Sequence, residues 1–423
     1  MKLFRKLVFW THLVTAVSAA VVILLMSVTG VLLTYQRQIT AWADLRGLEA
    51  GPPAAGAARL APDALLSRVA ATHPGTPTTL KWFADADAPA QVAFGREKTL
   101  FVSAYTGQVL SEGSMGVRAF FQKVVALHRW VGGEGERREL GKMITGAANL
   151  AFLFLVVSGF YLWFPRNWTR NAFRNVTWFR RGLSPKARDF NWHNVIGFWS
   201  AVPLFVIVVS GVVISYPWAG NLVYRVVGDT PPPPQGGAGG PAGPGGASAS
   251  RPGGAGGERG AGGERGGRGG GDAGEAVPLD GIGVLAARAE RQVQGWRSIT
   301  LTLPKKADEP VAFNIDRGDG GQPHKRASLA LDRTTGEVSK WEPFPSQSPG
   351  RRLRGILRFA HTGEVLGIPG QTLAGIVSLG AAFLVWTGLA LTWRRFRQWR
   401  APRRTAPASR RPEAMEEAET VSV

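Results

Sequence analysis

The sequence predicts a mainly α-helical membrane protein, with four transmembrane helices in two tandem repeats that each carry a small α+β module outside the membrane. Three observations support this fold class: long apolar runs, basic residues beside them, and intervals that recur in both halves. A helix needs roughly 20 apolar residues to span ~30 Å of hydrocarbon. Four runs meet this length: Leu13–Tyr35, Lys142–Phe164, Val195–Pro217 and Thr372–Trp393.

The basic residues predict the orientation of the four spans. They gather before the first run, between the second and third, and after the last: Lys2, Arg5, Lys6, Arg166, Arg170, Arg174, Arg180, Arg181, Lys186, Arg188, Arg394, Arg395, Arg397 and Arg400. Loops rich in Lys and Arg stay in the cytoplasm. Both termini and the 165–190 loop are therefore expected there. This distribution explains much of the net charge of +20 and argues against nucleic acid as a partner.

The first apolar run also has the small residues of a secretory signal peptide, at Ala16, Ser18 and Ala19. We favour a retained span, because the run is longer than a usual signal-peptide core and cleavage would remove His12. The chain contains no cysteine, which excludes disulfides, iron–sulfur clusters and covalently attached c-type haem.

The segments 36–118 and 218–352 are expected outside, in the periplasm of a Gram-negative cell. Each is predicted to contain one helix, Pro62–Ala71 and Gly281–Gln294, followed by short strands with a Thr-Gly turn. A Pro/Gly-rich insert, 230–274, is typical of a disordered linker.

Recurring intervals indicate that one unit is used twice. The interval from Gly107 to Gly336 is the same as the interval from Gly159 to Gly388. The interval from His12 to His193 is shorter. The difference is close to the length of the Pro/Gly-rich insert, so one insertion explains the change of interval.

Histidines at the ends of the spans are the candidate functional residues. The chain has six histidines: His12, His73, His128, His193, His324 and His361. His12 and His193 correspond in the repeat and lie on the cytoplasmic side of odd-numbered spans. His128 and His361 precede the even-numbered spans on the outer side. The interval from His128 to His361 is slightly longer than the interval between the paired glycines. His73 and His324 have no counterparts.

Two histidines at one depth can approach each other across the repeat axis, and neutral imidazole is a good ligand for haem iron. Two b-type haems, one between His12 and His193 and one between His128 and His361, would form an electron path across the bilayer. A single histidine at an interface is more often only an amphipathic side chain. Four nearby cations could pair with haem propionates or be ordinary interface charges: Arg5, Lys6, Arg129 and Arg358.

Each span also contains a Ser or Thr followed by Gly: Thr29-Gly30, Ser158-Gly159, Ser210-Gly211 and Thr387-Gly388. Close packing around a flat ligand would use such pairs, but small-residue contacts between helices explain them equally well.

Several short motifs resemble the PepSY-associated transmembrane proteins: Tyr105-Thr106-Gly107-Gln108-Val109, Thr335-Gly336-Glu337-Val338, Leu127-His128-Arg129 and Trp192-His193. The functional relatives in that family are bacterial inner-membrane reductases for iron–siderophore complexes with two b-type haems. The resemblance implies that His12, His193, His128 and His361 are the axial ligands. His361-Thr362-Gly363 lacks the basic residue that follows His128, so the two halves of the outer site differ.

The leading hypothesis is a transmembrane oxidoreductase that reduces a ferric chelate, such as a ferric siderophore, at the periplasmic face with electrons from a cytoplasmic or quinol donor. One alternative is a regulatory protein whose modules bind a peptide or protease, without haem. Another is a cytochrome b subunit that serves a different periplasmic acceptor. Trp82, Trp296 and Trp341 are expected either in the core or at the substrate.

The predicted division of the chain follows from these assignments: span 1 (1–35), module 1 (36–118), interfacial helix and span 2 (119–164), basic loop (165–190), span 3 (191–217), module 2 with the insert (218–352), interfacial segment and span 4 (353–393) and tail (394–423).

Overall fold

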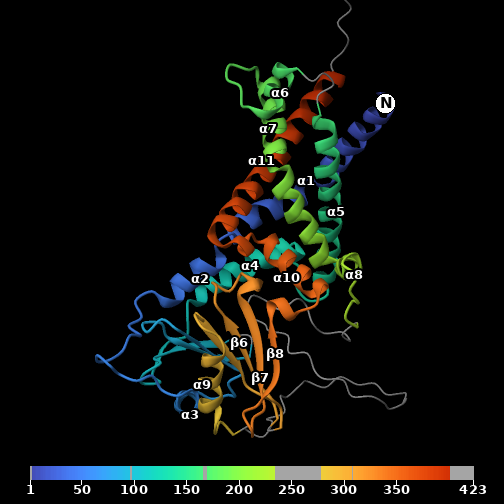
Figure 1. Ribbon diagram of the computed structural model, residues 1–423. Helices are drawn as coiled ribbons and strands as arrows, with labels where there is room; N and C mark the ends of the chain where they lie inside the picture. The colour runs from blue at the N-terminus through green and yellow to red at the C-terminus, as the bar shows by residue number, and fades with distance from the viewer. Residues whose placement is uncertain (1, 96–97, 165–168, 234–277, 307, 401–423) are drawn as a thin grey trace, which may run out of the picture.

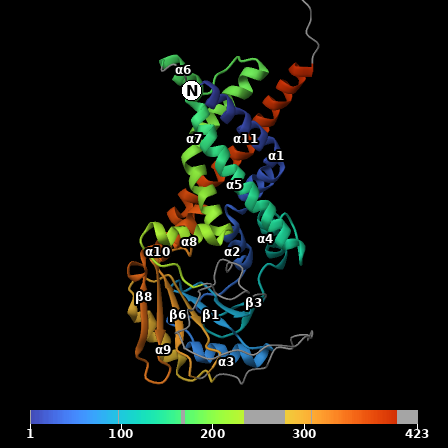
Figure 2. The ribbon, with the colours of Figure 1, turned by 90° about the vertical axis from the view of Figure 1, so that its right-hand side faces the viewer.

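The computed structural model describes residues 2–95, 98–164, 169–233, 278–306 and 308–400. A bundle of long helices stands on a β-sheet part (Figures 1 and 2). The start of α1 and the end of α11 lie at one end of the bundle, the termini end, and the sheet lies at the other, the sheet end (Figure 1). Most of the predicted insert (230–274) and of the tail (394–423) falls outside the described residues.

Four helices of the described residues are long and apolar enough to cross a membrane. They are α1 (Lys2–Leu33), α5 (Arg137–Trp163), α7 (Pro185–Ser215) and α11 (Gly367–Arg400). Large apolar side chains stay exposed on their outer surfaces, such as Val21 on α1 and Val202 on α7. The contacts α1–α5, α5–α7, α7–α11 and α11–α1 close a ring of four helices. The chain is therefore a multi-pass, mainly helical membrane protein.

Shorter helices join the bundle to the sheet. The described part of the chain has α2 (Gln36–Leu45) and α8 (Pro217–Val226) directly after α1 and α7, and α4 (Met115–Trp130) and α10 (Pro349–His361) before α5 and α11; α6 (Arg170–Thr177) lies at the termini end. The sequence pattern does not predict α2 and α8. An aspartate, Asp44 in the last turn of α2 and Asp229 shortly after α8, holds the start of the next interfacial helix. The Asp44 carboxylate accepts from the backbone N–H of Ser114 (2.7 Å), and that of Asp229 accepts from Gly350 (3.0 Å).

One antiparallel sheet of eight strands replaces the two separate modules that the sequence analysis expects. Its order is β4-β3-β2-β1-β5-β6-β7-β8. The strands are β1 (Thr79–Phe83), β2 (Ala90–Phe94), β3 (Lys98–Val102), β4 (Val109–Ser111), β5 (Ser298–Thr302), β6 (Val311–Asp316), β7 (Arg326–Leu331) and β8 (Val338–Pro343). β1 and β5 pair along their whole length, from Thr79↔Thr302 to Phe83↔Ser298. Two separate modules would each leave this edge unpaired, and pairing them removes both edges.

The two helices α3 (Pro62–Thr72) and α9 (Ile282–Gln292) pack together on one face of the sheet. Between them and the strands lies the core of this part, with side chains from both halves of the chain. Trp82 is buried there and its indole N–H donates to Glu290 (2.8 Å), while Trp296 and Trp341 pack against the core. Trp82 thus belongs to the core, and Trp296 and Trp341 lie at its edge.

The elements follow the same order in the two halves of the described chain. After α1 come a short helix, a helix, four strands, an interfacial helix and a long helix, and after α7 the same series follows, with the short helices η1 (Pro323–Lys325), η2 (Phe344–Ser346) and η3 (Glu364–Leu366) added. α6 is an addition between the halves.

The joint between α4 and α5 has no room for a side chain at Gly141. A Cβ there would meet the backbone carbonyl of Trp130, and Thr145 donates to the carbonyl of Arg129 in the same joint (2.8 Å). We expect Gly141→Ala to destabilise the protein by about 1–3 kcal/mol through overpacking, seen as a lower melting temperature in detergent. Gly116→Ala in α4, where a Cβ meets nothing within 4 Å, is the matched control. Equal melting temperatures for the two variants would contradict this packing.

Candidate functional site

The four span-associated histidines occupy two levels of the bundle. His12 on α1 and His193 on α7 lie toward the termini end, near the start of each helix, and form the termini-end pair. His128 in the last turn of α4 and His361 at the end of α10 form the sheet-end pair. The bundle thus holds one histidine pair near each end.

The remaining two histidines lie in the sheet part. His73 follows α3, where its Nδ1 hydrogen-bonds with the hydroxyl of Thr72 (3.0 Å), and the exposed His324 lies in η1. The structure brings neither of them into the bundle.

Both imidazoles of the termini-end pair are held by a hydroxyl on the next helix. His12 Nδ1 is 2.8 Å from Ser158 Oγ on α5, and His193 Nδ1 is 2.9 Å from Thr387 Oγ1 on α11. Each hydroxyl also lies close to the carbonyl one turn earlier in its own helix, 2.6 Å for Ser158 and 2.8 Å for Thr387. Because a carbonyl has no proton to give, each hydroxyl donates its only proton to it.

The sheet-end pair has the same arrangement. His128 Nδ1 lies 2.9 Å from Thr29 Oγ1 on α1, and the Thr29 hydroxyl donates to its own helix at 2.6 Å. His361 Nδ1 lies 3.3 Å from Ser210 Oγ on α7 and only 2.8 Å from the Ile207 carbonyl. The Ser210 hydroxyl also donates to Ile207 (2.8 Å).

These contacts fix the tautomer of all four rings. A hydroxyl whose proton is already donated can only accept, so Nδ1 of each histidine carries the hydrogen. The Ile207 carbonyl can also only accept, so Nδ1 of His361 must carry the hydrogen. In neutral imidazole the other nitrogen, Nε2, then keeps its lone pair. Every hydrogen bond described above engages Nδ1 and none of them engages Nε2. All four are therefore available to bind a metal.

The glycine after each hydroxyl residue makes room for the ring. A Cβ on Gly159 would lie 3.3 Å from His12 Cε1, and one on Gly211 would lie 3.2 Å from His361 Cε1. The corresponding distances are 3.5 Å for Gly388 to His193 and 3.8 Å for Gly30 to His128. Each histidine thus packs on a Ser/Thr-Gly pair of a neighbouring span.

The two rings of the sheet-end pair have the spacing of two ligands on one metal. The ring centres of His128 and His361 are 6.3 Å apart, with an angle of 61° between the ring planes. An imidazole nitrogen binds a metal at roughly 2 Å and the ring centre lies about 1 Å behind it, so two rings on opposite sides of a metal have centres roughly 6 Å apart. At the termini end, His12 lies within electrostatic range of His193.

The two levels are separated by most of the membrane thickness. On α1, the interval from His12 to Thr29 is the same as the interval from His193 to Ser210 on α7. At the rise of an α-helix this interval is roughly 25 Å along the axis. Each of these helices thus contributes a histidine at one level and a hydroxyl at the other.

This two-level arrangement falls within the region that a family model recognises. The model described as the PepSY-associated TM region matches residues 9–411. The chain belongs to this family. The match covers all four histidines, the hydroxyls that hold them and the sheet. No curated protein matches the sequence.

Within this PepSY-associated TM protein, the four cations considered as propionate partners have different surroundings. Arg5 donates to the carbonyls of Leu162 (2.7 Å) and Phe164 (2.9 Å) at the end of α5, which is an ordinary helix-end contact. Arg129 and Arg358 lie beside the sheet-end pair on α4 and α10. Burial lowers the pKa of both guanidinium groups, and each stacks on the aromatic residue after it. For Lys6 the structure gives no contact that assigns a role.

The contacts that the Ser/Thr-Gly pairs make with the histidines are not evident from the sequence, in which helix packing explains the pairs equally well. A signal was present, because the interval from His12 to Thr29 recurs from His193 to Ser210. The partners become visible only when α4 and α10 place His128 and His361 against α1 and α7.

Removing the hydroxyl that holds His193 is a direct test of the tautomer. Thr387→Val keeps the side-chain shape but leaves Nδ1–H without its acceptor. Loss of such an outer partner typically costs 10–100-fold in metal affinity, and we expect a loss of that order at the termini end. Thr387→Ser restores the acceptor and is expected to behave like the wild type. If both variants retain bound metal equally, the hydroxyl does not position His193.

Proposed function

We propose that this PepSY-associated TM protein carries electrons across a membrane through two b-type haems, held by His12 with His193 and by His128 with His361. The observation that supports this most strongly is the set of four Nε2 atoms left free because each Nδ1–H donates to a hydroxyl or, for His361, most closely to the Ile207 carbonyl. A haem bound through two histidine nitrogens takes up and releases a single electron at its iron.

The donor set fits haem better than a bare metal ion. Each level offers two imidazole nitrogens, and no group of three or more His, Cys, Asp or Glu that could hold a metal occurs in the described part of the chain. Zinc sites usually have three or four protein ligands. A macrocycle supplies the remaining ligands itself.

The residues of the chain have distinct tasks in this proposal. The four histidines bind, and Ser158, Thr387, Thr29 and Ser210 orient their rings. The apolar spans exclude water and hold the two levels one above the other within the roughly 30 Å of hydrocarbon. Arg129 and Arg358 supply positive charge for the acidic groups of a haem at the sheet end.

The proposed reaction is the one-electron reduction of a ferric chelate, such as a ferric siderophore, at the sheet end. The chelated Fe(III) gains one electron and becomes Fe(II), and a donor at the termini end, cytoplasmic or from the quinol pool, loses one. No proton needs to move on the protein. The proposal places the protein in a bacterial inner membrane as a tandem repeat, with both termini in the cytoplasm and the sheet in the periplasm, as the basic flanks predict.

Rapid mixing under anaerobic conditions tests this function. The dithionite-reduced protein is mixed with a ferric chelate, and reoxidation is followed by the loss of the sharp α band of reduced haem b. We expect reoxidation with formation of one Fe(II) per electron, trapped by an Fe(II)-specific chromophore. Reoxidation by other acceptors but not by ferric chelates would favour the cytochrome b subunit that serves a different periplasmic partner.

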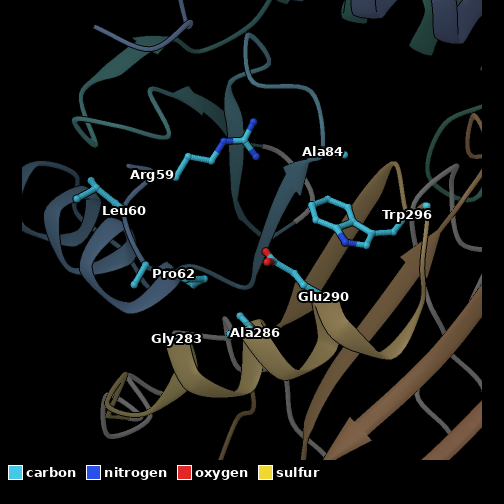
Figure 3. Close-up of a pocket in the computed structure, with 11 residues that line it drawn as sticks. Arg59, Leu60, Pro62, Ala84, Gly283, Ala286, Glu290 and Trp296 are labelled. Atoms are coloured by element: carbon cyan, nitrogen blue, oxygen red, sulfur yellow. The ribbon is translucent and has the colours of Figure 1, made fainter. Parts of the chain in front are cut away.

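A second candidate, a regulatory protein that binds a peptide or protease without haem, is favoured by one observation. A pocket of about 510 Å³ lies between α3, α9 and the end of β1, and Glu290, Trp296 and Arg59 line it (Figure 3). However, Arg59 already donates to backbone carbonyls and Glu290 accepts from Trp82. Their existing partners weaken the case for a ligand. A preparation without haem absorption would support this candidate instead of the first.

A further inference from the structure

The face of the sheet opposite α3 and α9 carries a row of polar side chains centred on Lys81. Side chains alternate along a strand, so Leu80 and Trp82 enter the core beneath α3 and α9 while Lys81 points to the opposite face. Directly paired residues share a face, and the row across the sheet is Gln91, Lys81, Thr300, Asn314, Ser328 and Glu342. Donors and acceptors of this kind suit a polar ligand.

The next row on this face, Phe83, Ser298, Asp316 and Arg326, places a cation near Lys81, and Arg37 and Arg326 both lie beside Gly320. Arg326 on β7 pairs with Asp316 (3.1 Å), and Arg37 on α2 pairs with Glu364 in η3 (2.7 Å). In the described residues Lys81 has no ion pair, and its ammonium lies over the ring of Phe83. We call Lys81, Arg37 and Arg326 the basic cluster. One of its three charges is left without a carboxylate.

The basic cluster is short of negative charge. The pKa of Lys81 is lowered by burial, and the charges of Arg37 and Arg326 lower it further, although Asp316 opposes them. An arriving anion would relieve this repulsion and stabilise the charged amine.

The basic cluster is also next to the sheet-end pair. The guanidinium of Arg326 lies 5.1 Å from the ring centre of Phe359, which shortly precedes His361 on α10. The Glu364 partner of Arg37 lies shortly after His361 in the chain. The basic cluster thus contacts residues on both sides of His361 in the chain.

We propose that the basic cluster binds the ferric chelate, and that the protein selects chelates with net negative charge, such as carboxylate or catecholate complexes, over uncharged ones. This rests on the proposed reductase function and names its substrate class. Charge-assisted hydrogen bonds from an ammonium and two guanidinium groups recognise such anions. The acidic headgroup of a lipid has the same chemistry, so the test must separate the two sources.

Gallium chelates measure docking without electron transfer, because Ga(III) has the charge and size of Fe(III) but is not reduced. Calorimetry of the full chain in nanodiscs of zwitterionic lipid would use Ga(III) citrate and an uncharged Ga(III) trihydroxamate. We expect saturable binding of Ga(III) citrate that weakens at high salt, and at least tenfold weaker binding of the uncharged complex. Equal binding of both complexes would overturn the selectivity.

Lys81→Gln is expected to weaken Ga(III) citrate binding roughly tenfold, as for the loss of a charged hydrogen-bond donor. Lys98→Gln on β3 is the matched control, since Lys98 pairs with Glu112 (2.9 Å) and lies outside the basic cluster. Arg326→Gln, which removes a second cation, should also weaken binding. Folding of each variant is checked by its melting temperature. Equal binding by the Lys81 and Lys98 variants would overturn the proposal.

Nanodiscs with anionic lipid separate chelate from headgroup. If the basic cluster serves the chelate, Ga(III) citrate still binds there and still depends on Lys81. If anionic lipid abolishes binding, the basic cluster is a headgroup site and the proposal fails. A haem-free preparation that still binds Ga(III) citrate would overturn the reductase function but not the anion site, so the two failures can be told apart.

Discussion

Replacing His193 by leucine is expected to lower the bound haem from two per chain to one. Leucine has no nitrogen to bind iron, and His12 alone would leave the termini-end site with one protein ligand. In the proposed assignment the sheet-end site has its own ligands, His128 and His361, roughly 25 Å away along the helices, and should stay filled. The haem-to-protein ratio, measured by pyridine haemochrome absorbance on the purified protein, checks the result.

The same experiment on other histidines shows whether the pairing is right. His12→Leu should give the same loss, and the double variant His12→Leu/His193→Leu should lose no more than either single one. His73→Leu and His324→Leu, both in the sheet part, should keep two haems per chain. A loss of both haems from His193→Leu, or a loss from His73→Leu, would contradict the assignment of ligands.

Adding one methyl group at Gly211 is expected to damage the sheet-end site. The new Cβ would lie 2.9 Å from Asn149 Nδ2 and 3.2 Å from His361 Cε1, so the ring of His361 or its neighbour must move. Displacing the ring of a metal-binding histidine should weaken metal binding as the loss of its hydrogen-bond partner does. We therefore expect haem affinity to fall on the order of tenfold or more. Haem release to apomyoglobin measures it.

Gly197→Ala on the same helix is the matched control. Its Cβ would meet only Leu384 Cδ2, at an ordinary 3.7 Å, so two haems should remain with wild-type release rates. The Gly211→Ala variant should also reduce ferric chelates more slowly while its termini-end haem stays reducible. Identical release from the two variants would mean that Gly211 does not shape the site.

The membrane part of the fold follows closely from the sequence, because long apolar runs and their basic flanks have few other structural solutions. Each predicted run coincides with a spanning helix, although the first three runs extend one or two residues past the end of their helices, and the predicted PepSY-associated family is confirmed. The helices α3 and α9 also form where apolar periodicity predicts them. In each case the signal is local.

What the sequence did not predict depends on contacts between distant residues. The pairing of β1 with β5 joins segments from opposite halves of the chain, and the sequence of neither strand indicates which strand it pairs with. The same holds for Thr29 and His128, which meet across α1 and α4. The Ser/Thr-Gly pairs were visible, but a small polar residue in a span has several uses. Only the folded arrangement distinguishes a ring acceptor from a packing contact.

The visible spectrum of the purified full-length protein, with its haem content, tests the central claim most directly. The proposal predicts two non-covalent haems per chain, a Soret band, and a sharp α band on reduction, with the low-spin signature of two histidine ligands. A folded, monodisperse protein that binds no haem, even after expression with added haem precursor, would contradict it.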